Sequence, residues 1–184
     1  MAKVGQPAPT FQLASTKNAT SAKDLGFEIA LDDYAGTWLV LFFYPLDFTF
    51  VCPTEILALS DRYDEFTSLG ADVLGCSTDS VYSHFAWINT PKTQNGIAGL
   101  RFPLVADYKK ETAAAYGVLD ETDGKAQRGL FIIDPDGMLR YSTVTADNVG
   151  RSVDETLRVL QALQTGGLCA ADWKPGKQLL EIGA

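Results

Sequence analysis

Cys52 is the residue of this chain that is best placed to do chemistry. It lies between an apolar run, residues 39–44, and Pro53, and proline is favoured at the first helical position because its missing N–H would be unpaired there. Free amide groups and the positive end of the helix dipole at such a position favour a thiolate. The spacing predicts a sulfur nucleophile at the carboxyl end of a strand. An inert buried thiol is the alternative that the residues alone leave open.

The other two cysteines differ from Cys52 in their surroundings. Cys76 lies inside a predicted strand, where a buried small hydrophobe is the favoured interpretation. Cys169 lies past the last predicted helix, where a structural cysteine would have little to pack against. Three scattered cysteines make no disulfide framework and indicate a reducing compartment. With His84 as the only histidine and no Cys-x-x-Cys, we expect no metal site.

The elements that would position Cys52 follow an α/β pattern. A strand buried on both faces is predicted at 37–44, an amphipathic helix at 53–69 and a second strand at 72–77, which together form one βαβ unit with parallel strands. The further predicted elements are a helix at 80–89, a turn-rich loop at 90–99, a strand at 102–106, a short helix at 107–117, a polar segment at 118–127, an antiparallel hairpin of strands at 128–133 and 138–145, and a helix at 153–164 that opens on a capping box, Ser152 to Glu155.

The length suits a single domain spanning 1–184. We expect residues 1–36 to form a hairpin or edge packed on the main sheet, and residues 166–184 to form a C-terminal arm. The net charge of −8 disfavours nucleic acid or an anionic membrane as partner, because both need basic patches. No run approaches the roughly 20 apolar residues that cross a bilayer, and the N-terminus has no long apolar core. The expected location is the cytoplasm.

The segment Pro45-Leu-Asp-Phe-Thr-Phe-Val-Cys52 resembles the Pro-x-x-x-Thr/Ser-x-x-Cys signature of peroxiredoxins. Its continuation through Pro53-Thr-Glu55 resembles the typical two-cysteine branch, which includes the bacterial alkyl hydroperoxide reductases and the thiol-specific antioxidant proteins. Three further matches follow in order: Arg128-Gly-Leu-Phe-Ile-Ile-Asp134, Val149-Gly-Arg-Ser-Val-Asp-Glu155, and Cys169 followed by Trp173-Lys-Pro-Gly176. Together they extend over most of the chain.

The resemblance implies a thioredoxin-like α/β fold with a central mixed sheet, an N-terminal extension and a C-terminal arm. The implied activity is reduction of hydrogen peroxide and organic hydroperoxides by a thiol, without metal, haem or flavin. The implied electron donor is thioredoxin or a flavoprotein disulfide reductase. The resemblance also implies a homodimer that assembles into a ring of five dimers.

The resemblance implies roles for seven residues: Cys52, Cys169, Thr49, Arg128, Pro45, Glu55 and Arg151. Cys52 would attack the peroxide O–O bond and become a sulfenic acid, and Cys169 would condense with it, in typical members across two subunits. Thr49 would bond the peroxide, although a loop threonine bonded to its own backbone is the alternative. Pro45 would shield the thiolate from water.

Arg128 would hold Cys52 ionised, and Glu55 and Arg151 would join a hydrogen-bonded network near the site. A solvated strand end is the alternative for Arg128. Arg151 stands just before a predicted helix N-terminus, where positive charge is unhelpful, which favours a functional role over capping.

Two other function classes remain open. A cysteine hydrolase could use Cys52 with His84, although a lone histidine on a helix is more often a packed residue. A redox sensor or chaperone-like assembly could use the same scaffold. The segment Asn95-Gly-Ile-Ala-Gly99 departs from the Gly-Gly-Leu-Gly of overoxidation-sensitive members, the chain stops eight residues after Gly176, and Ala170 replaces a common proline. The first two departures predict resistance to excess peroxide.

Overall fold

The computed structural model describes residues 1–181, so the last three residues of the expected arm lie outside the described residues. The chain divides into two compact units, Met1–Arg151 and Ser152–Ala184. A single domain with an arm that begins at residue 166 therefore stays a prediction.

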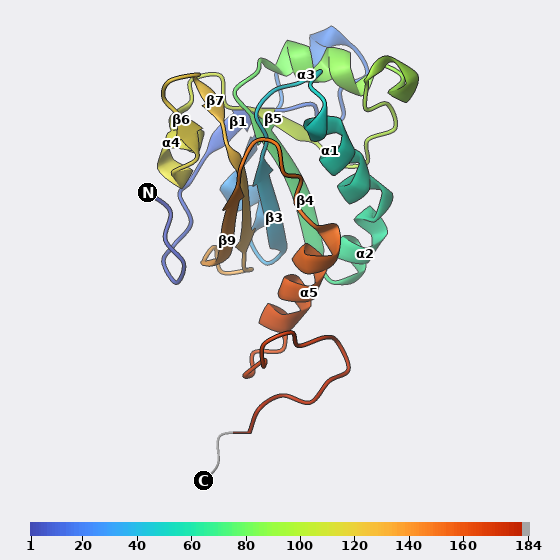
Figure 1. Ribbon diagram of the computed structural model, residues 1–184. Helices are drawn as coiled ribbons and strands as arrows, with labels where there is room; N and C mark the ends of the chain where they lie inside the picture. Colours follow the sequence, from blue (N-terminus) through green and yellow to red (C-terminus); the bar gives the residue numbers. More distant parts are fainter. Residues whose placement is uncertain (182–184) are drawn as a thin grey trace. The chain divides into compact units, whose positions relative to one another are not determined.

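A five-stranded mixed sheet forms the centre of the first unit, in the order β5-β4-β3-β8-β9 (Figure 1). The strands are β3 (Trp38–Phe43), β4 (Ala71–Ser77), β5 (Leu104–Ala106), β8 (Arg128–Ile133) and β9 (Leu139–Thr145). β3 pairs parallel with β4 and antiparallel with β8, while β4 is parallel to β5 and β9 returns antiparallel to β8. The predicted mixed sheet, its βαβ unit and its hairpin are confirmed.

The apolar run of β3 is buried because both faces of the sheet are covered, as its composition predicts. Leu39, Leu41 and Phe43 point into one core cluster, which they share with Cys76 of β4 and Tyr116. Side chains alternate along a strand, so their neighbours Val40 and Phe42 face the opposite side. The residues that follow β3 therefore extend from a strand that is packed on both faces.

Four helices of the first unit are α1 (Val51–Asp61), α2 (Tyr63–Ser68), α3 (Val81–Ile88) and α4 (Glu111–Tyr116). Figure 1 shows α1 and α2 on one side of the sheet and α4 on the other. The single helix expected at 53–69 is wrong in one respect, because it breaks at Arg62 into α1 and α2. The apolar repeat continues through the break, so the pattern carries no signal for it.

Smaller elements complete this unit. The strands β1 (Gln12–Ala14) and β2 (Glu28–Ala30) form the expected N-terminal hairpin, and a bridge from Ser15 to Val105 joins it to the edge strand β5. The segment expected to be merely polar at 118–127 contains a second small hairpin, which its composition did not indicate. The remaining elements are β6 (Leu119–Asp120), β7 (Lys125–Ala126), and the 3-10 helices η1 (Ala22–Asp24), η2 (Leu31–Tyr34) and η3 (Lys92–Gln94).

The second unit begins with α5 (Val153–Gln164). Ser152 caps it by accepting the Glu155 N–H, but only half of the predicted capping box forms, because the Glu155 carboxylate bonds Arg158 instead. Beyond α5, Leu168 and Leu180 form an isolated antiparallel bridge.

Within residues 1–181, none of the helices has the length and apolarity needed to span a bilayer. The same part of the chain contains no cluster of three or more metal-ligating His, Cys, Asp or Glu side chains.

Candidate active site

The antiparallel pairing of β3 with β8 decides which residues meet at the site. Because the two strands run in opposite directions, β8 begins where β3 ends. Arg128, the first residue of β8, therefore lies beside the C-terminal end of β3. The chain leaves β3 at Tyr44, passes through residues 45–50, here called the 45–50 turn, and enters α1 at Val51. Two segments about 80 residues apart are thereby brought together.

Cys52 lies in the first turn of α1, and its side chain is fully buried. The sequence suggested that the helix starts at Pro53, but it starts at Val51, one residue before Cys52. The sulfur therefore still lies at the helix N-terminus. Nη1 of Arg128 donates to Sγ of Cys52 over 3.3 Å. A guanidinium is always charged, so a permanent cation lies within hydrogen-bond distance of this sulfur. The cation is 3% exposed and is not a solvated strand end.

Glu55 lies one helical turn after Cys52 and connects two arginines. Its Oε2 accepts from Nη1 of Arg128 at 2.6 Å, and its Oε1 accepts from Nε of Arg151 at 2.7 Å and from the Arg151 backbone N–H at 2.8 Å. Burial raises the pKa of the Glu55 carboxyl, but the bonds to Arg151 and then the charge of Arg128 outweigh burial and hold the pKa below its usual 4.5. Glu55 therefore stays ionised between two cations.

The same network acts on Arg128. Burial lowers the pKa of this guanidinium, but its contact with Cys52 and its ion pair with Glu55 outweigh burial and raise the pKa above its usual value. Nε of Arg128 donates to the carbonyl of Asp147 at 2.8 Å, which leaves Nη1 directed at the sulfur and the carboxylate. The guanidinium is held in one orientation by three different groups.

Arg151 is fixed more tightly than its place before a helix suggests. Its Nη1 donates to the carbonyls of Phe43 at 2.9 Å and Gly129 at 2.6 Å, and its guanidinium lies 5.5 Å from the centre of the Phe42 ring. The carbonyls at the end of β3 and the start of β8 attract the cation that the helix dipole would disfavour. Arg151 thus joins both strands to Glu55.

Thr49 and Pro45 lie in the 45–50 turn. The hydroxyl of Thr49 donates to the carbonyl of Leu46 at 2.9 Å, which is the backbone bond considered as an alternative for this residue. Its oxygen can still accept a hydrogen bond. Pro45 is buried, while Thr49 is partly exposed. Both expected residues are in the turn that precedes Cys52, and their roles stay predictions.

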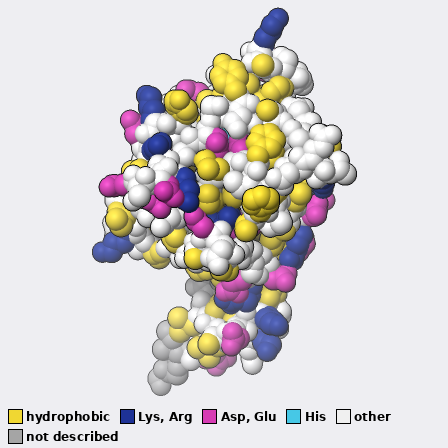
Figure 2. Space-filling view, turned by 45° about the horizontal axis from the view of Figure 1, so that its top comes forward, with side chains coloured by type: hydrophobic (Ala, Val, Ile, Leu, Met, Phe, Trp, Pro, Cys, Tyr) yellow, Lys and Arg dark blue, Asp and Glu magenta, His cyan; other side chains and the backbone are white. Residues whose placement is uncertain are grey.

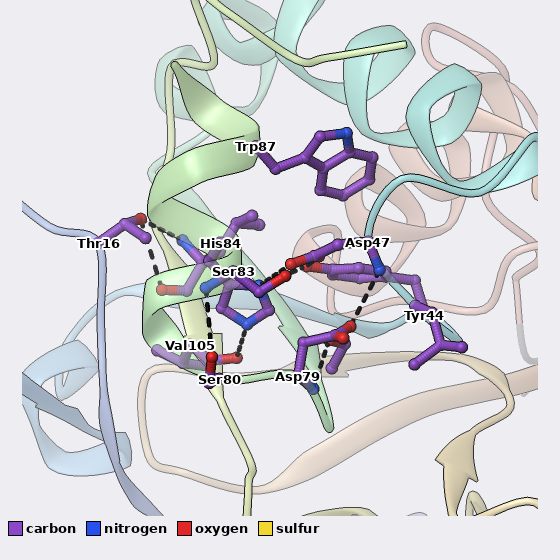
Figure 3. A network of polar contacts seen from close by, with 12 residues as sticks. Thr16, Tyr44, Asp47, Asp79, Ser80, Ser83, His84, Trp87 and Val105 are labelled. Carbon is purple, nitrogen blue, oxygen red and sulfur yellow. Dashed lines mark hydrogen bonds and ion pairs between the residues drawn. The ribbon is translucent and has the colours of Figure 1, made fainter. Parts of the chain in front are cut away.

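The inner side of the 45–50 turn is fixed by a polar cluster that the sequence motifs did not predict (Figure 3). The Asp47 carboxylate accepts from the Tyr44 hydroxyl at 2.9 Å and contacts Nδ1 of His84 at 2.8 Å, while the Asp47 N–H donates to Asp79 at 2.9 Å. Burial, followed by the charge of Asp47, raises the pKa of Tyr44 well above its usual value, so its hydroxyl remains a donor. A single acidic residue among apolar ones, at position 47, was the available signal.

His84 belongs to this cluster and not to the thiol. Its ring is fully buried, with Nδ1 beside Asp47 and Tyr44 and Nε2 3.2 Å from the carbonyl of Val105. Figure 3 shows the ring between Asp47 and Val105. His84 makes no hydrogen bond to Cys52 in the described part of the chain, so the hydrolase alternative is wrong and the packed histidine is correct.

The other two cysteines have different surroundings. Cys76 is fully buried in the apolar cluster of β3 and β4, and burial, with a smaller effect from the charge of Asp107, raises its pKa well above the usual value. Cys169, in the second unit, is partly exposed and contacts Thr165 Oγ1 at 3.6 Å and the Ala162 carbonyl at 3.7 Å. All three cysteines are free thiols.

The 45–50 turn exposes apolar side chains. Figure 2 brings the top of Figure 1 forward and shows several hydrophobic side chains on this face, among polar and charged ones. Leu46, Phe48 and Phe50 of the turn are exposed, and Phe50 is 89% exposed. The buried sulfur of Cys52 thus contacts a fixed cation and lies next to exposed apolar side chains of the turn.

Residues 4–142 match the family model described as the AhpC/TSA family. The chain belongs to that family. It is 55% identical over 179 residues to the "Putative peroxiredoxin YkuU" of Bacillus subtilis. This alignment covers 96% of this chain and 97% of that protein. It is 51% identical over 182 residues to "Peroxiredoxin-1" of Gallus gallus, covering 97% of this chain and 89% of the relative.

Solved structures agree with this peroxiredoxin assignment. The reduced 2-Cys peroxiredoxin of Plasmodium vivax has a TM-score of 0.89 at 37% identity, covering 97% of this chain and 93% of its own. Mycobacterium tuberculosis AhpC has a TM-score of 0.81 at 41% identity, and the match covers 95% of this chain and 99% of the AhpC chain. The predicted family, the thioredoxin-like fold and the thiol-dependent peroxidase activity are confirmed. Peroxiredoxins act on peroxides with a thioredoxin-type reductant and are generally dimers or decamers.

Proposed function

We propose that Cys52 is the peroxidatic thiol of this peroxiredoxin. The observation that carries the proposal is the 3.3 Å contact between Arg128 Nη1 and Cys52 Sγ. The thiolate attacks one oxygen of the hydroperoxide, the O–O bond breaks, and the departing oxygen takes the bonding electrons and a proton to leave as water or an alcohol. Cys52 is oxidised to a sulfenic acid.

Arg128 and Thr49 assist this step. Negative charge develops on the departing oxygen, and a fixed cation beside it lowers the barrier most. Because the Thr49 proton is committed to the Leu46 carbonyl, the Thr49 oxygen is the acceptor for the peroxide O–H. Glu55 and Arg151 orient Arg128, and buried Pro45 limits access of water to the sulfur.

Cys169 resolves the sulfenic acid. Its thiol attacks the oxidised sulfur of Cys52, a disulfide forms and water leaves. Partial exposure of Cys169 supports this role, since a resolving thiol must reach its target and a reductant. We infer that the bridge joins two subunits. A dithiol reductant, thioredoxin or a flavoprotein disulfide reductase, then reopens it.

Three finer aspects complete the proposal. The chain acts as a homodimer that assembles into a ring of five dimers, and the exposed apolar side chains of the 45–50 turn support self-association. The enzyme works in the cytoplasm, which the small number and wide spacing of its cysteines support. Hydrogen peroxide and organic hydroperoxides are both substrates.

The test is non-reducing electrophoresis of peroxide-treated protein beside a turnover assay with a dithiol reductant. The wild type should double in mass, Cys169→Ser should stay single, and Cys52→Ser should lose turnover. Cys76→Ala is the matched control and should show the wild-type mass shift and turnover, because the Cys76 sulfur lies in the apolar core, away from Cys52 and Arg128. Turnover retained in Cys52→Ser would overturn the proposal, and an unchanged mass in the wild type would overturn the intersubunit bridge.

A further inference from the structure

The backbone of the 45–50 turn is strained next to the residue that we propose binds peroxide. Phe48, which directly precedes Thr49, has φ of +54°. A bulky side chain rarely adopts this left-handed conformation, which persists only where surrounding contacts enforce it. The contacts that hold Phe48 in place therefore also decide where Thr49 lies.

One side chain from a distant loop holds both residues. The amide nitrogen Nδ2 of Asn95 donates to the carbonyl of Phe48 at 3.2 Å and to the carbonyl of Thr49 at 2.9 Å. A primary amide has two N–H donors, so one asparagine can serve two successive carbonyls at once. An oxygen in place of this nitrogen could serve neither, because a carboxylate only accepts.

Asn95 is itself held firmly. Its backbone carbonyl accepts from Nε1 of Trp87 at 2.8 Å, and the centre of the Trp87 ring lies 5.8 Å from that of Phe48. Asn95 has φ of +60°, a conformation that asparagine tolerates better than most residues. Trp87 is fully buried, so the loop and the turn are both fixed against one rigid side chain of α3.

The loop behind Asn95 has little freedom to move. A Cβ added to Gly96 would lie 1.9 Å from the carbonyl oxygen of Thr90, so the two backbone segments are in direct contact. The next residue, Ile97, is fully buried, and its N–H donates to the Trp87 carbonyl at 3.2 Å. The loop can therefore act as a fixed support rather than follow the turn.

The turn is thus held from two sides. On the inner side of the turn, Asp47 is bonded to Tyr44 and His84, as Figure 3 shows. On the other side, Asn95 bonds the carbonyls of Phe48 and Thr49. We propose that Asn95 is a positioning residue for peroxide reduction, which keeps Phe48 in its strained conformation and so aims the Thr49 hydroxyl at the peroxide beside Cys52. This inference rests on the proposed function of Thr49 and Cys52.

The test compares two reactions of Cys52 in the full-length reduced protein. Oxidation by hydrogen peroxide, followed by rapid quenching and mass spectrometry, needs Thr49, whereas alkylation by iodoacetamide does not. Asn95→Asp keeps the shape but removes both donors, and Asn95→Gly removes the side chain at a φ that glycine accepts. Both variants should oxidise about 5- to 30-fold more slowly, while alkylation stays within about two-fold of the wild type.

Asn89→Asp is the matched control, since its amide also donates to a backbone carbonyl, that of Phe85 at 2.8 Å. It should oxidise at the wild-type rate. In a Thr49→Val background, Asn95→Asp should add little further loss, because Asn95 acts through Thr49. The inference would be overturned if oxidation were unchanged in both Asn95 variants, or if their alkylation slowed as much as their oxidation. It would also be overturned if Asn89→Asp slowed oxidation as much as Asn95→Asp, or if Asn95→Asp slowed oxidation as much in the Thr49→Val background as in the wild type. A wild type that is not oxidised at Cys52 would instead defeat the proposed function.

Discussion

Cys52 and Cys76 are both fully buried thiols in the first unit, yet their surroundings differ in charge. Cys52 has a helix N-terminus around it and the Arg128 guanidinium 3.3 Å away. Cys76 lies among apolar side chains of the core, and burial raises its pKa well above the usual value. On the proposed function, burial alone does not make a thiol inert. What distinguishes the two sulfurs is that a fixed cation and a helix N-terminus accompany Cys52 only.

Removing the cation should have the largest effect, on the rate at which Cys52 reacts with peroxide. Arg128→Met leaves Cys52 buried without its charged partner, and we expect the rate of Cys52 oxidation by peroxide to fall about 10²- to 10³-fold. Stopped-flow measurement of the oxidation rate checks this. Arg101→Met is the matched control, because Arg101 pairs with Asp64 at the surface and should leave the rate unchanged. An Arg128→Met rate within about three-fold of wild type would mean that the helix N-terminus suffices.

Removing the carboxylate that orients the cation should mainly affect stability. Glu55→Gln leaves two buried arginines without their counter-charge, and we expect a loss of about 3–5 kcal/mol in the free energy of unfolding at pH 7. Urea unfolding measures this difference. Asp64→Asn removes an exposed partner of Arg101 and should change stability little. Equal losses in the free energy of unfolding would show that the buried network stabilises the fold no more than an exposed ion pair does.

The same network predicts the acid side of the stability profile. The pKa of Glu55 is lower in the folded protein than its usual 4.5, because the bonds to Arg151 and the charge of Arg128 outweigh burial. The unfolded state therefore binds a proton first as the pH falls, so this stabilisation is complete above about pH 4.5 and is lost as the pH drops through the lower folded value. Urea unfolding between pH 7 and pH 3 should show a steeper loss for wild type than for Glu55→Gln. Parallel profiles would contradict the assignment.

Truncating the inert thiol should have the smallest effect. Cys76→Ala removes one sulfur from a packed core, so we expect a loss of about 1–2 kcal/mol in stability. The rate of peroxide oxidation at Cys52 should not change. Thermal unfolding and the turnover assay measure the two quantities. A fall in turnover without a matching loss of folded protein would give Cys76 a redox role that its surroundings do not support.

The two thiols also show what the sequence could predict. Cys52 at a helix start and Arg128 at a strand start were visible in the motifs, and the antiparallel pairing of β3 with β8 brings them together. The surroundings of Cys76 followed from its place in an apolar strand. The local placements follow from residue pattern, whereas the meeting of Arg128 with Cys52 was implied only by the family resemblance, because the sequence alone did not predict that β3 pairs with β8.

Other parts of the site depend on contacts between loops, for which the sequence has no period. Asn95 lies in a turn-rich loop, and nothing in that loop indicates that its amide reaches Phe48 and Thr49, which lie 47 and 46 residues earlier. The role of Asp47 depends in the same way on His84, 37 residues away. Such contacts form only once α3 has packed against the sheet. Periodicity and motif spacing therefore could not reveal them.

The central claim is that the contact with Arg128 makes one of two buried thiols reactive. The most direct measurement is trapping of sulfenic acid with dimedone after one equivalent of hydrogen peroxide at pH 7, quantified at each cysteine by mass spectrometry in a Cys169→Ser background. We predict a label on nearly all Cys52, none on Cys76, and little on Cys52 when Arg128→Met is added. Similar labelling of Cys52 and Cys76, or full labelling of Cys52 without Arg128, would contradict the account.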